Sequence, residues 1–400
     1  MNLSRRRFLE VSSKGTMCLG LSSPFLRPQY ASAQDESVSS GKGLDHLEFQ
    51  EPQEEPELLK EAMFYTPLDE LRVQCHLCPW ECAVADQERG TCGVRENRQG
   101  KYYTLVHSQP CAAHVDPIEK KPLFHYLPGS LAFSLATAGC NIECKFCQNW
   151  DIAQVRPEQV KSYYLPPEDV TNIALRYECQ TIAYTYSEPV VFYEYVYDSS
   201  QHARQAGVGN VMISNGFIKK DPLVELCQYL SGVKIDLKAF TEKFYREICR
   251  GQLQPVLETL ETLRDLGIWY EIVVLIVPTL NDSQQEIHDM SRWIYQELGA
   301  QVPVHFSRFH PMYKITNLPP TPVKTIEMAR DIALETGLHY VYVGNLVGHP
   351  SESTYCPGCG KKVIHRIGYR IMSVELDETG RCQHCQYQIP GVWNAAQIQA

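Results

Sequence analysis

Three cysteines near the middle of the chain constrain its fold more than any other feature. Cys140, Cys144 and Cys147 have the spacing C-x3-C-x2-C, and we call them the cluster triad. A [4Fe–4S] cluster usually takes four cysteine thiolates, so a site with three leaves one iron open to another ligand. Phe146 adds an apolar wall beside the last cysteine. A zinc site or a set of disulfides is the alternative, but zinc favours four ligands in paired C-x2-C turns.

The cluster triad resembles the signature of the radical S-adenosylmethionine (radical SAM) superfamily. The resemblance implies that the amino and carboxylate groups of S-adenosylmethionine chelate the open iron. It also implies that one electron from the cluster cleaves the sulfonium to methionine and a 5′-deoxyadenosyl radical, which abstracts hydrogen from a substrate. The protein's own task would be to position these cofactors and to exclude water.

Eight further cysteines form two more groups, which favours metal ligation over a disulfide scaffold. The C-terminal cysteine group is two C-x2-C pairs separated by 22 residues: Cys356, Cys359, Cys382 and Cys385. Two such pairs put four sulfurs on one tetrahedral metal, so we expect a zinc ribbon, with rubredoxin-type iron as the alternative. Residues 362–366 and 368–376 are predicted strands, and Gly358, Gly360 and Gly380 are expected to supply the turns. His384, between two ligands, is interpreted as a bystander.

The N-terminal cysteine group is less regular, with gaps of two, three and nine residues between Cys75, Cys78, Cys82 and Cys92. Four thiolates suit either structural zinc or an auxiliary iron–sulfur cluster, and the spacing leaves both interpretations open. His76 is able to replace a cysteine, although a surface histidine is the simpler interpretation.

The middle of the chain alternates between two kinds of segment. Short runs rich in β-branched or aromatic residues predict strands at 131–137, 181–186, 210–214, 233–237, 270–277, 302–306 and 340–343. Helical periodicity occupies 167–178, 191–206, 222–230, 255–266, 283–298 and 323–336, with prolines at helix starts. Six such units imply an α/β fold with parallel strands, and they suit the open, partial (β/α)6 barrel of radical SAM enzymes.

Polar residues follow the predicted strands, where the active groups of parallel α/β folds collect. They are Ser187-Glu188, Ser214-Asn215, Asp236 and Lys238, Asn281-Asp282, and His305, Ser307, Arg308 and His310. Strand ends are solvated and favour polar residues in any case. Five successive loops with the same placement nevertheless predict a shared pocket.

Several stretches resemble the radical SAM enzyme of the AmmeMemoRadiSam system, a family similar to the pyruvate formate-lyase-activating enzymes. They are Asp116-Pro-Ile-Glu-Lys-Lys-Pro-Leu123, Cys147-Gln-Asn-Trp150, Tyr184-Thr-Tyr-Ser-Glu-Pro189, His305-Phe-Ser-Arg-Phe-His-Pro311, Val343-Gly-Asn345 and Ile389-Pro-Gly-Val-Trp393. The resemblance implies that Ser187 and Glu188 receive the methionine amino group, and that Asn215, Asp236 and Lys238 line the cosubstrate. The activating enzymes carry Gly-Gly-Glu where this chain has Tyr186-Ser187-Glu188, so the glycine turn is expected to be lost.

The resemblance also implies partner proteins of the Memo and AMMECR types, and an electron donor such as flavodoxin or ferredoxin. Activation of a glycyl-radical enzyme, in which hydrogen is taken from a backbone glycine of a large partner, is an alternative activity. A non-catalytic metal-binding interaction protein, docking through its outer cysteine groups, is the alternative from another class. The net charge of −10 argues against general nucleic-acid binding, which needs clustered Lys and Arg.

The first 33 residues resemble a twin-arginine export signal. Ser4-Arg5-Arg6-Arg7-Phe8-Leu9 is followed by a weakly apolar stretch and by Ala31-Ser32-Ala33, a small-residue cleavage site. We therefore expect export through the twin-arginine translocase, with the cytoplasm, where S-adenosylmethionine is made, as the alternative. The predicted organisation is a signal at 1–33, a disordered linker at 34–56, a Cys-rich module at 57–115, a radical SAM core at 116–348 and a zinc-ribbon-like module at 349–400.

Overall fold

The computed structural model describes residues 58–398, in which an eight-stranded mixed sheet is the central element. Strands β8 to β14 run parallel in chain order, and β7 pairs antiparallel with β8. The edge strands β7 and β14 do not pair with each other, so the sheet is open and forms no closed barrel. The bounds are β7 (Ala112–Pro117), β8 (Leu131–Ala136), β9 (Thr181–Tyr184), β10 (Gly209–Ser214), β11 (Gly232–Asp236), β12 (Tyr270–Ile276), β13 (Val304–Arg308) and β14 (Val341–Gly344).

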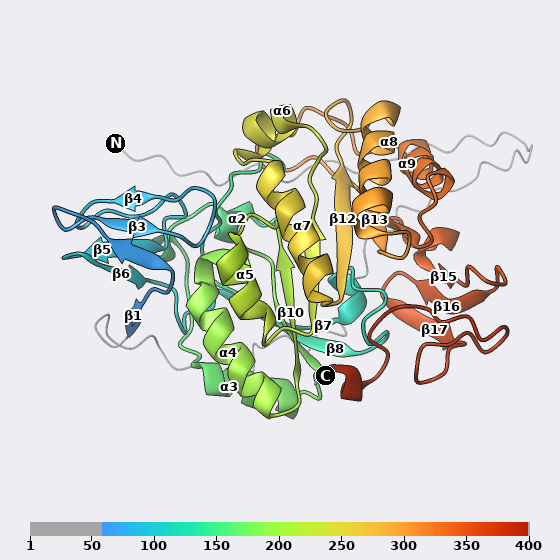
Figure 1. Ribbon diagram of the computed structural model, residues 1–400, viewed down its shortest axis with the longest axis horizontal. Coiled ribbons are helices and arrows are strands. Elements are labelled where there is room, and N and C mark those ends of the chain that lie inside the picture. The colour runs from blue at the N-terminus through green and yellow to red at the C-terminus, as the bar shows by residue number, and fades with distance from the viewer. Residues whose placement is uncertain (1–57, 399–400) are drawn as a thin grey trace, which may run out of the picture. The chain divides into compact units, whose positions relative to one another are not determined.

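Helices connect the successive parallel strands and lie along the sheet, as Figure 1 shows. The connecting helices are α3 (Pro167–Arg176), α4 (Tyr193–Gln205), α5 (Lys220–Cys227), α7 (Gln254–Leu266), α8 (Gln284–Trp293) and α9 (Val323–Glu335). Two short helices, α2 (Trp150–Ala153) and α6 (Glu242–Phe244), lie in the loops after β8 and β11. The predicted alternating α/β fold with six βα units is confirmed.

The sequence of the parallel strands explains their place in the molecule. All four residues of β9 are buried, and so are six of the seven residues of β12. Such continuous apolar runs are typical of parallel strands, because helices cover the faces of the sheet. Strand β7 was not predicted, since it contains His114, Asp116 and Pro117 in place of an apolar run. It is an edge strand, where proline is tolerated.

Two small antiparallel sheets precede the central sheet. One contains β1 (Lys60–Glu61), β6 (Lys101–Thr104) and β5 (Arg95–Arg98), and the other contains β2 (Tyr65–Pro67), β3 (Val73–Cys75) and β4 (Ala83–Val84). A buried ion pair between Arg95 and Glu194 fastens β5 to helix α4. The N-terminal cysteine group is therefore held against the central fold.

A third small sheet, β15 (Thr354–Tyr355), β16 (Lys362–Ile367) and β17 (Arg370–Val374), carries the C-terminal cysteine group. The predicted module boundaries stay predictions. Strand β7 spans the predicted boundary between the Cys-rich module, which ends at residue 115, and the radical SAM core, which begins at residue 116. The predicted signal at 1–33 and linker at 34–56 lie outside the described residues. Within 58–398, no helix is both long enough and apolar enough to cross a membrane.

Candidate functional site

The cluster triad lies in the loop after β8, at the carboxyl end of the parallel strands. Cys144 is buried, whereas Cys140 and Cys147 are half-buried. Burial raises the pKa of the Cys147 thiol to about 11 and that of Cys140 well above its usual value, so a metal is needed to hold them as thiolates. The ligand atoms of a site for one metal ion all lie within 4.8 Å of one another, and the three triad sulfurs do not meet this limit. At least two of the triad sulfurs are thus too far apart to share one small metal ion, which is compatible with a cluster in which each thiolate binds a different iron.

Cys249 is a neighbour of the triad that sequence reasoning did not identify. It is buried, and its hydrogen bond to Cys144, more than burial, raises the pKa of the Cys144 thiol well above the usual value. The backbone N–H of Glu143 donates to the Cys249 carbonyl at 2.8 Å, which fixes this segment against the cluster loop. The proximity of Cys249 to Cys144 could be recognised only from the structure, because 104 residues lie between them in the chain.

The turn after β9 contains a residue in the left-handed region of backbone conformation. Tyr186 has a φ of 63°, in the left-handed region that glycine adopts most easily. The chain thus forms a left-handed turn at this position without a glycine, and the expected loss of the tighter glycine turn stays a prediction. The side-chain amide of Asn149 donates to the Tyr186 carbonyl at 2.8 Å, which ties this turn to the residues that follow the cluster triad.

A buried ion pair anchors the ring of Tyr186. Its hydroxyl donates to Asp116, whose other polar contacts are the ammonium groups of Lys120 and Lys121. The Lys121 ammonium also lies 4.5 Å from the centroid of the tyrosine ring, a cation–π distance. The segment from Asp116 to Lys121, one of the stretches that carry the family resemblance, thus positions the turn ahead of Ser187 and Glu188.

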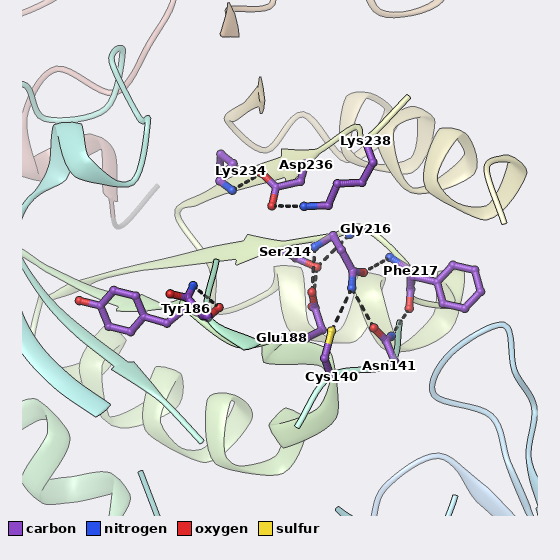
Figure 2. A network of polar contacts seen from close by, with 12 residues as sticks. Cys140, Asn141, Tyr186, Glu188, Ser214, Gly216, Phe217, Lys234, Asp236 and Lys238 are labelled. Atoms are coloured by element: carbon purple, nitrogen blue, oxygen red, sulfur yellow. Dashed lines mark hydrogen bonds and ion pairs between the residues drawn. The ribbon is translucent and has the colours of Figure 1, made fainter. Parts of the chain in front are cut away.

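Glu188 is a buried carboxylate beside the cluster loop (Figure 2). It accepts hydrogen bonds from the Ser214 hydroxyl at 2.7 Å, the Asn215 N–H at 2.8 Å and the Val190 N–H at 3.2 Å. It has no ion-pair partner among the described residues. Burial outweighs these hydrogen bonds and raises its pKa to about 7, so a further hydrogen-bond donor on a ligand would stabilise the ionised form.

Ser187 presents a buried hydroxyl without a hydrogen-bond partner among the described residues. An unsatisfied buried hydroxyl costs about 1–3 kcal/mol, unless a ligand supplies the partner. Ser187 and Glu188 together therefore fit a polar ligand bearing N–H groups. The charge of Glu188 acts on the Cys140 thiol, which places this ligand position next to the triad.

Asn215 links the loop after β10 to the cluster loop. Its side-chain amide donates to the Asn141 oxygen at 2.9 Å and to the Cys140 sulfur at 3.7 Å (Figure 2). Its own oxygen accepts from the Phe217 N–H at 2.8 Å. Since its side-chain groups are engaged by the protein, Asn215 orients the first triad cysteine.

Asp236 is held between two lysines at the end of β11 (Figure 2). Its carboxylate pairs with Lys234 and, at 2.8 Å, with Lys238. Burial raises the pKa of Asp236, but the two ammonium groups outweigh it and lower the value to about 2. The Lys238 charge also reaches Cys144 and Cys147, so it offsets the negative charge of metal-bound thiolates. Lys234 was not a candidate before the structure was known.

The later strand ends are less uniform than predicted. Asn281 follows β12, and its side-chain amide donates to the Lys238 carbonyl at 2.8 Å. It therefore holds the backbone of Lys238 in place. The placement of His305 at a strand end is wrong, because it is the second residue of β13 and pairs with buried Glu271 at 2.7 Å. It belongs to the core.

The C-terminal cysteine group has the geometry of a site for one metal. All four sulfurs lie within 4.8 Å of one another, with Cys356–Cys385 at 3.5 Å and Cys359–Cys382 at 3.8 Å. Zinc–sulfur bonds of about 2.3 Å in a tetrahedron put the sulfurs about 3.8 Å apart, so the group fits zinc.

The two C-x2-C turns repeat each other. Gly360 donates to the Cys356 carbonyl at 2.8 Å, and Gln386 donates to the Cys382 carbonyl at the same distance. Gly360 and Gly380 have positive φ values, as expected, but Gly358 does not. A Cβ at Gly358 would lie 3.0 Å from Tyr387, so this glycine is needed for close packing. Both ring nitrogens of His384 contact other side chains.

The N-terminal cysteine group surrounds the start of β4. Cys75 ends β3, Cys78 and Cys82 lie in the loop between β3 and β4, and Cys92 precedes β5. None of the four is fully exposed. His76 bonds to the Thr66 hydroxyl at 3.0 Å on the surface and is not directed at the cysteines.

Comparisons with known proteins agree with this geometry. Residues 134–294 match the Radical SAM superfamily. An archaeal relative, the uncharacterized protein MJ0808 of Methanocaldococcus jannaschii, is 46% identical over 332 residues, which cover 83% of this chain and 99% of that protein. A second protein of the same organism, MJ0674, is 37% identical over 82 residues, or 20% of this chain and 19% of that protein.

Solved structures align more distantly. A radical SAM methyltransferase from Sphaerobacter thermophilus has a TM-score of 0.45 at 12% identity and covers 58% of this chain and 68% of that chain. A domain of a pyruvate-formate lyase-activating enzyme from Bacteroides vulgatus has a TM-score of 0.37 at 14% identity, covering 41% of this chain and 98% of that domain.

The fold and the site define an enzyme of the radical SAM class. The chain belongs to the same family as MJ0808 of Methanocaldococcus jannaschii. These findings favour the enzyme over the non-catalytic interaction protein that the outer cysteine groups alone would allow.

Proposed function

We propose that this enzyme binds a [4Fe–4S] cluster on the cluster triad and cleaves S-adenosylmethionine reductively beside it. The observation that carries the proposal is the pair formed by the unsatisfied Ser187 hydroxyl and the Glu188 carboxylate, which are both buried, with Glu188 acting on Cys140. Together they provide acceptors for the N–H groups of the methionine amine of the cosubstrate. The cluster and S-adenosylmethionine, when bound, supply one electron and the hydrogen-abstracting 5′-deoxyadenosyl radical.

The chain's own residues orient the triad cysteines and offset the negative charge of their thiolates. Asn215 orients Cys140, and the positive charge of Lys238 acts on the two other triad cysteines. The carbonyls of Ile248 and Cys249 accept hydrogen bonds from the N–H groups of Lys145 and Glu143 and so hold the cluster loop in place. The polar side chains beside Cys140 are shielded from bulk water, because Asn141, Glu188 and Asn215 are each at most 5% exposed.

The test is anaerobic reconstitution of the full chain with iron and sulfide, followed by a strong reductant and S-adenosylmethionine. We expect 5′-deoxyadenosine and methionine in equal amounts. The variant Cys140→Ala/Cys144→Ala/Cys147→Ala should form neither product. Cys227→Ala is the matched control, since Cys227 belongs to none of the three cysteine groups. Equal cleavage by the triple variant and the parent would refute the proposal.

The finer assignment is to the AmmeMemoRadiSam system. Its support is that the stretch from Asp116 to Lys121, which carries part of the resemblance, contacts the turn that precedes Ser187. Membership implies Memo-type and AMMECR-type partners, and a flavodoxin or ferredoxin as the electron donor. Mixing the purified proteins and measuring complex formation by light scattering tests this, and the absence of any complex with either partner type would count against membership.

A further inference from the structure

The four N-terminal cysteines share one site. The Cys78 thiol interacts electrostatically with each of the other three. The backbone N–H of Cys75 donates to the Cys82 carbonyl at 3.0 Å, and the Cys82 sulfur lies 3.2 Å from the hydroxyl of Thr91, which precedes Cys92. The uneven spacing along the chain thus still brings all four sulfurs to one place.

The distances between these sulfurs differ from those of a zinc site. In the C-terminal cysteine group all four sulfurs lie within 4.8 Å of one another, as one tetrahedral metal requires. No three sulfurs of the N-terminal cysteine group satisfy that limit, although all four residues are described. The cluster triad shows the same wider spacing. A [4Fe–4S] cluster explains it, because its thiolates bind different irons.

A buried arginine next to this group also points to a bound anionic centre. Arg95 is 1% exposed, and its charge acts on both Cys75 and Cys92. One terminal nitrogen pairs with Glu194, but Nε and Nη1 have no hydrogen-bond partner among the described residues. Each unsatisfied buried donor costs about 1–3 kcal/mol, a cost that sulfur acceptors on an anionic cluster would remove.

The site lies directly against the cluster loop. A Cβ built on Gly139, the residue before Cys140, would meet the Cys92 carbonyl at 3.3 Å. The indole N–H of Trp80, between Cys78 and Cys82, donates to the Asn141 carbonyl at 2.6 Å. Trp80 and Thr91 also line, with Cys140, a cavity of about 290 Å³. The two cysteine sites are therefore neighbours.

We propose that the N-terminal cysteine group binds a second [4Fe–4S] cluster, and that Arg95 donates hydrogen bonds to it. This centre has four cysteine ligands and no open iron, so it differs from the triad cluster in binding no S-adenosylmethionine. Hydrogen bonds to cluster sulfur raise the reduction potential, so Arg95 is a positioning and tuning residue.

Metal analysis of the full chain after anaerobic reconstitution tests the first part. The parent should hold about eight irons and about one zinc, and the triple alanine variant of the triad about four irons and about one zinc. The remaining cluster should be reducible, with an electron paramagnetic resonance signal that S-adenosylmethionine does not alter. About four irons and two zincs in the parent, with no iron in the triad variant, would overturn the proposal.

The parent itself provides a second measurement in case the triad variant does not fold. Its reduced spectrum should contain two cluster signals, broadened by spin coupling between neighbouring clusters, and S-adenosylmethionine should change only one of them. A single signal that responds entirely to S-adenosylmethionine would exclude the second cluster.

The role of Arg95 is tested by redox titration of the cluster in the triad variant. Arg95→Lys keeps the positive charge but removes the Nε and Nη1 donors, so the midpoint potential should fall. Arg89→Lys is the matched control, because Arg89 pairs with Glu96 and Glu158 and is not among the groups that act on the cysteines. An equal midpoint potential in the triad variant with and without Arg95→Lys would refute the hydrogen-bonding role.

Discussion

Asp116→Asn should lower the free energy of unfolding far more than the small change from a carboxylate to an amide suggests. The Asp116 carboxylate accepts from the Tyr186 hydroxyl and pairs with Lys121, whose side chain is 2% exposed. Its pair with Lys120 involves a 44% exposed side chain and adds at most about 0.5 kcal/mol. Removing one member of the buried pair costs about 3–5 kcal/mol, because a buried charge loses its partner. The asparagine oxygen still accepts one hydrogen bond, so we expect a net loss of about 3 kcal/mol.

The pH dependence of this contribution follows from the pKa of Asp116. Burial raises that pKa, but Lys121, Lys120 and the Tyr186 hydroxyl outweigh burial and hold it below the usual 3.8. The stabilisation is therefore fully present above about pH 3.8 and is lost as the pH falls further. Burial lowers the pKa of Lys121 to about 8 even with Asp116 beside it, so variant and parent are compared at one fixed pH near 7.

The assay is denaturant unfolding of anaerobically reconstituted protein near pH 7, followed by tryptophan fluorescence. Asp265→Asn is the control, since Asp265 is 62% exposed and pairs with exposed Arg264, and it should change stability by less than about 0.5 kcal/mol. Asp116→Asn should also weaken binding of S-adenosylmethionine, because the Tyr186 turn carries Ser187 and Glu188. A stability loss no larger than that of the control would refute the reasoning.

Three further predictions concern binding, metal content and location. Glu188→Gln should weaken S-adenosylmethionine binding about 10- to 100-fold in anaerobic equilibrium dialysis, since a hydrogen bond to a charged group contributes about 1.5–3 kcal/mol; unchanged affinity would exclude direct contact. Cys382→Ala should lose one zinc and make the segment after residue 351 sensitive to protease while iron content stays constant; equal resistance of variant and parent would argue against structural zinc. Fractionation should place tagged parent protein outside the cytoplasm and an Arg5→Lys/Arg6→Lys variant inside it; identical distributions would refute the export signal.

The fold was predictable because its main signals are local. Runs such as 272–277 are apolar throughout, and the helices between them are amphipathic, so the alternation of elements could be identified without knowing any contact. Strand β7 was missed because an edge strand is defined by its neighbour, and its own residues, including Pro117, do not indicate a strand. Local sequence patterns thus predict the parallel strands of the core but not the edge strand β7.

The site was predictable only in part, for the same reason. Cysteine spacing identified the triad, and strand ends identified Glu188 and Asn215, because ligands and loops follow chain order. Cys249 and Arg95 act through partners distant in the sequence, where no spacing rule applies. Lys234 was missed for another reason: it lies inside β11 and not at the strand end, although its partner Asp236 is only two residues away. His305 was misplaced because its cross-strand partner on β12 could not be seen from the chain alone.

Gly139 makes the packing of the cluster loop depend on residues outside the central sheet. It has a φ of 102° and lies so close to Cys92 and Val94 that any side chain at this position would collide with them. The cluster loop therefore packs against Cys92 and Val94, which belong to the N-terminal part of the chain. A chain that started after residue 94 would retain every triad cysteine and every strand of the central sheet, but its cluster loop would lack this packing surface.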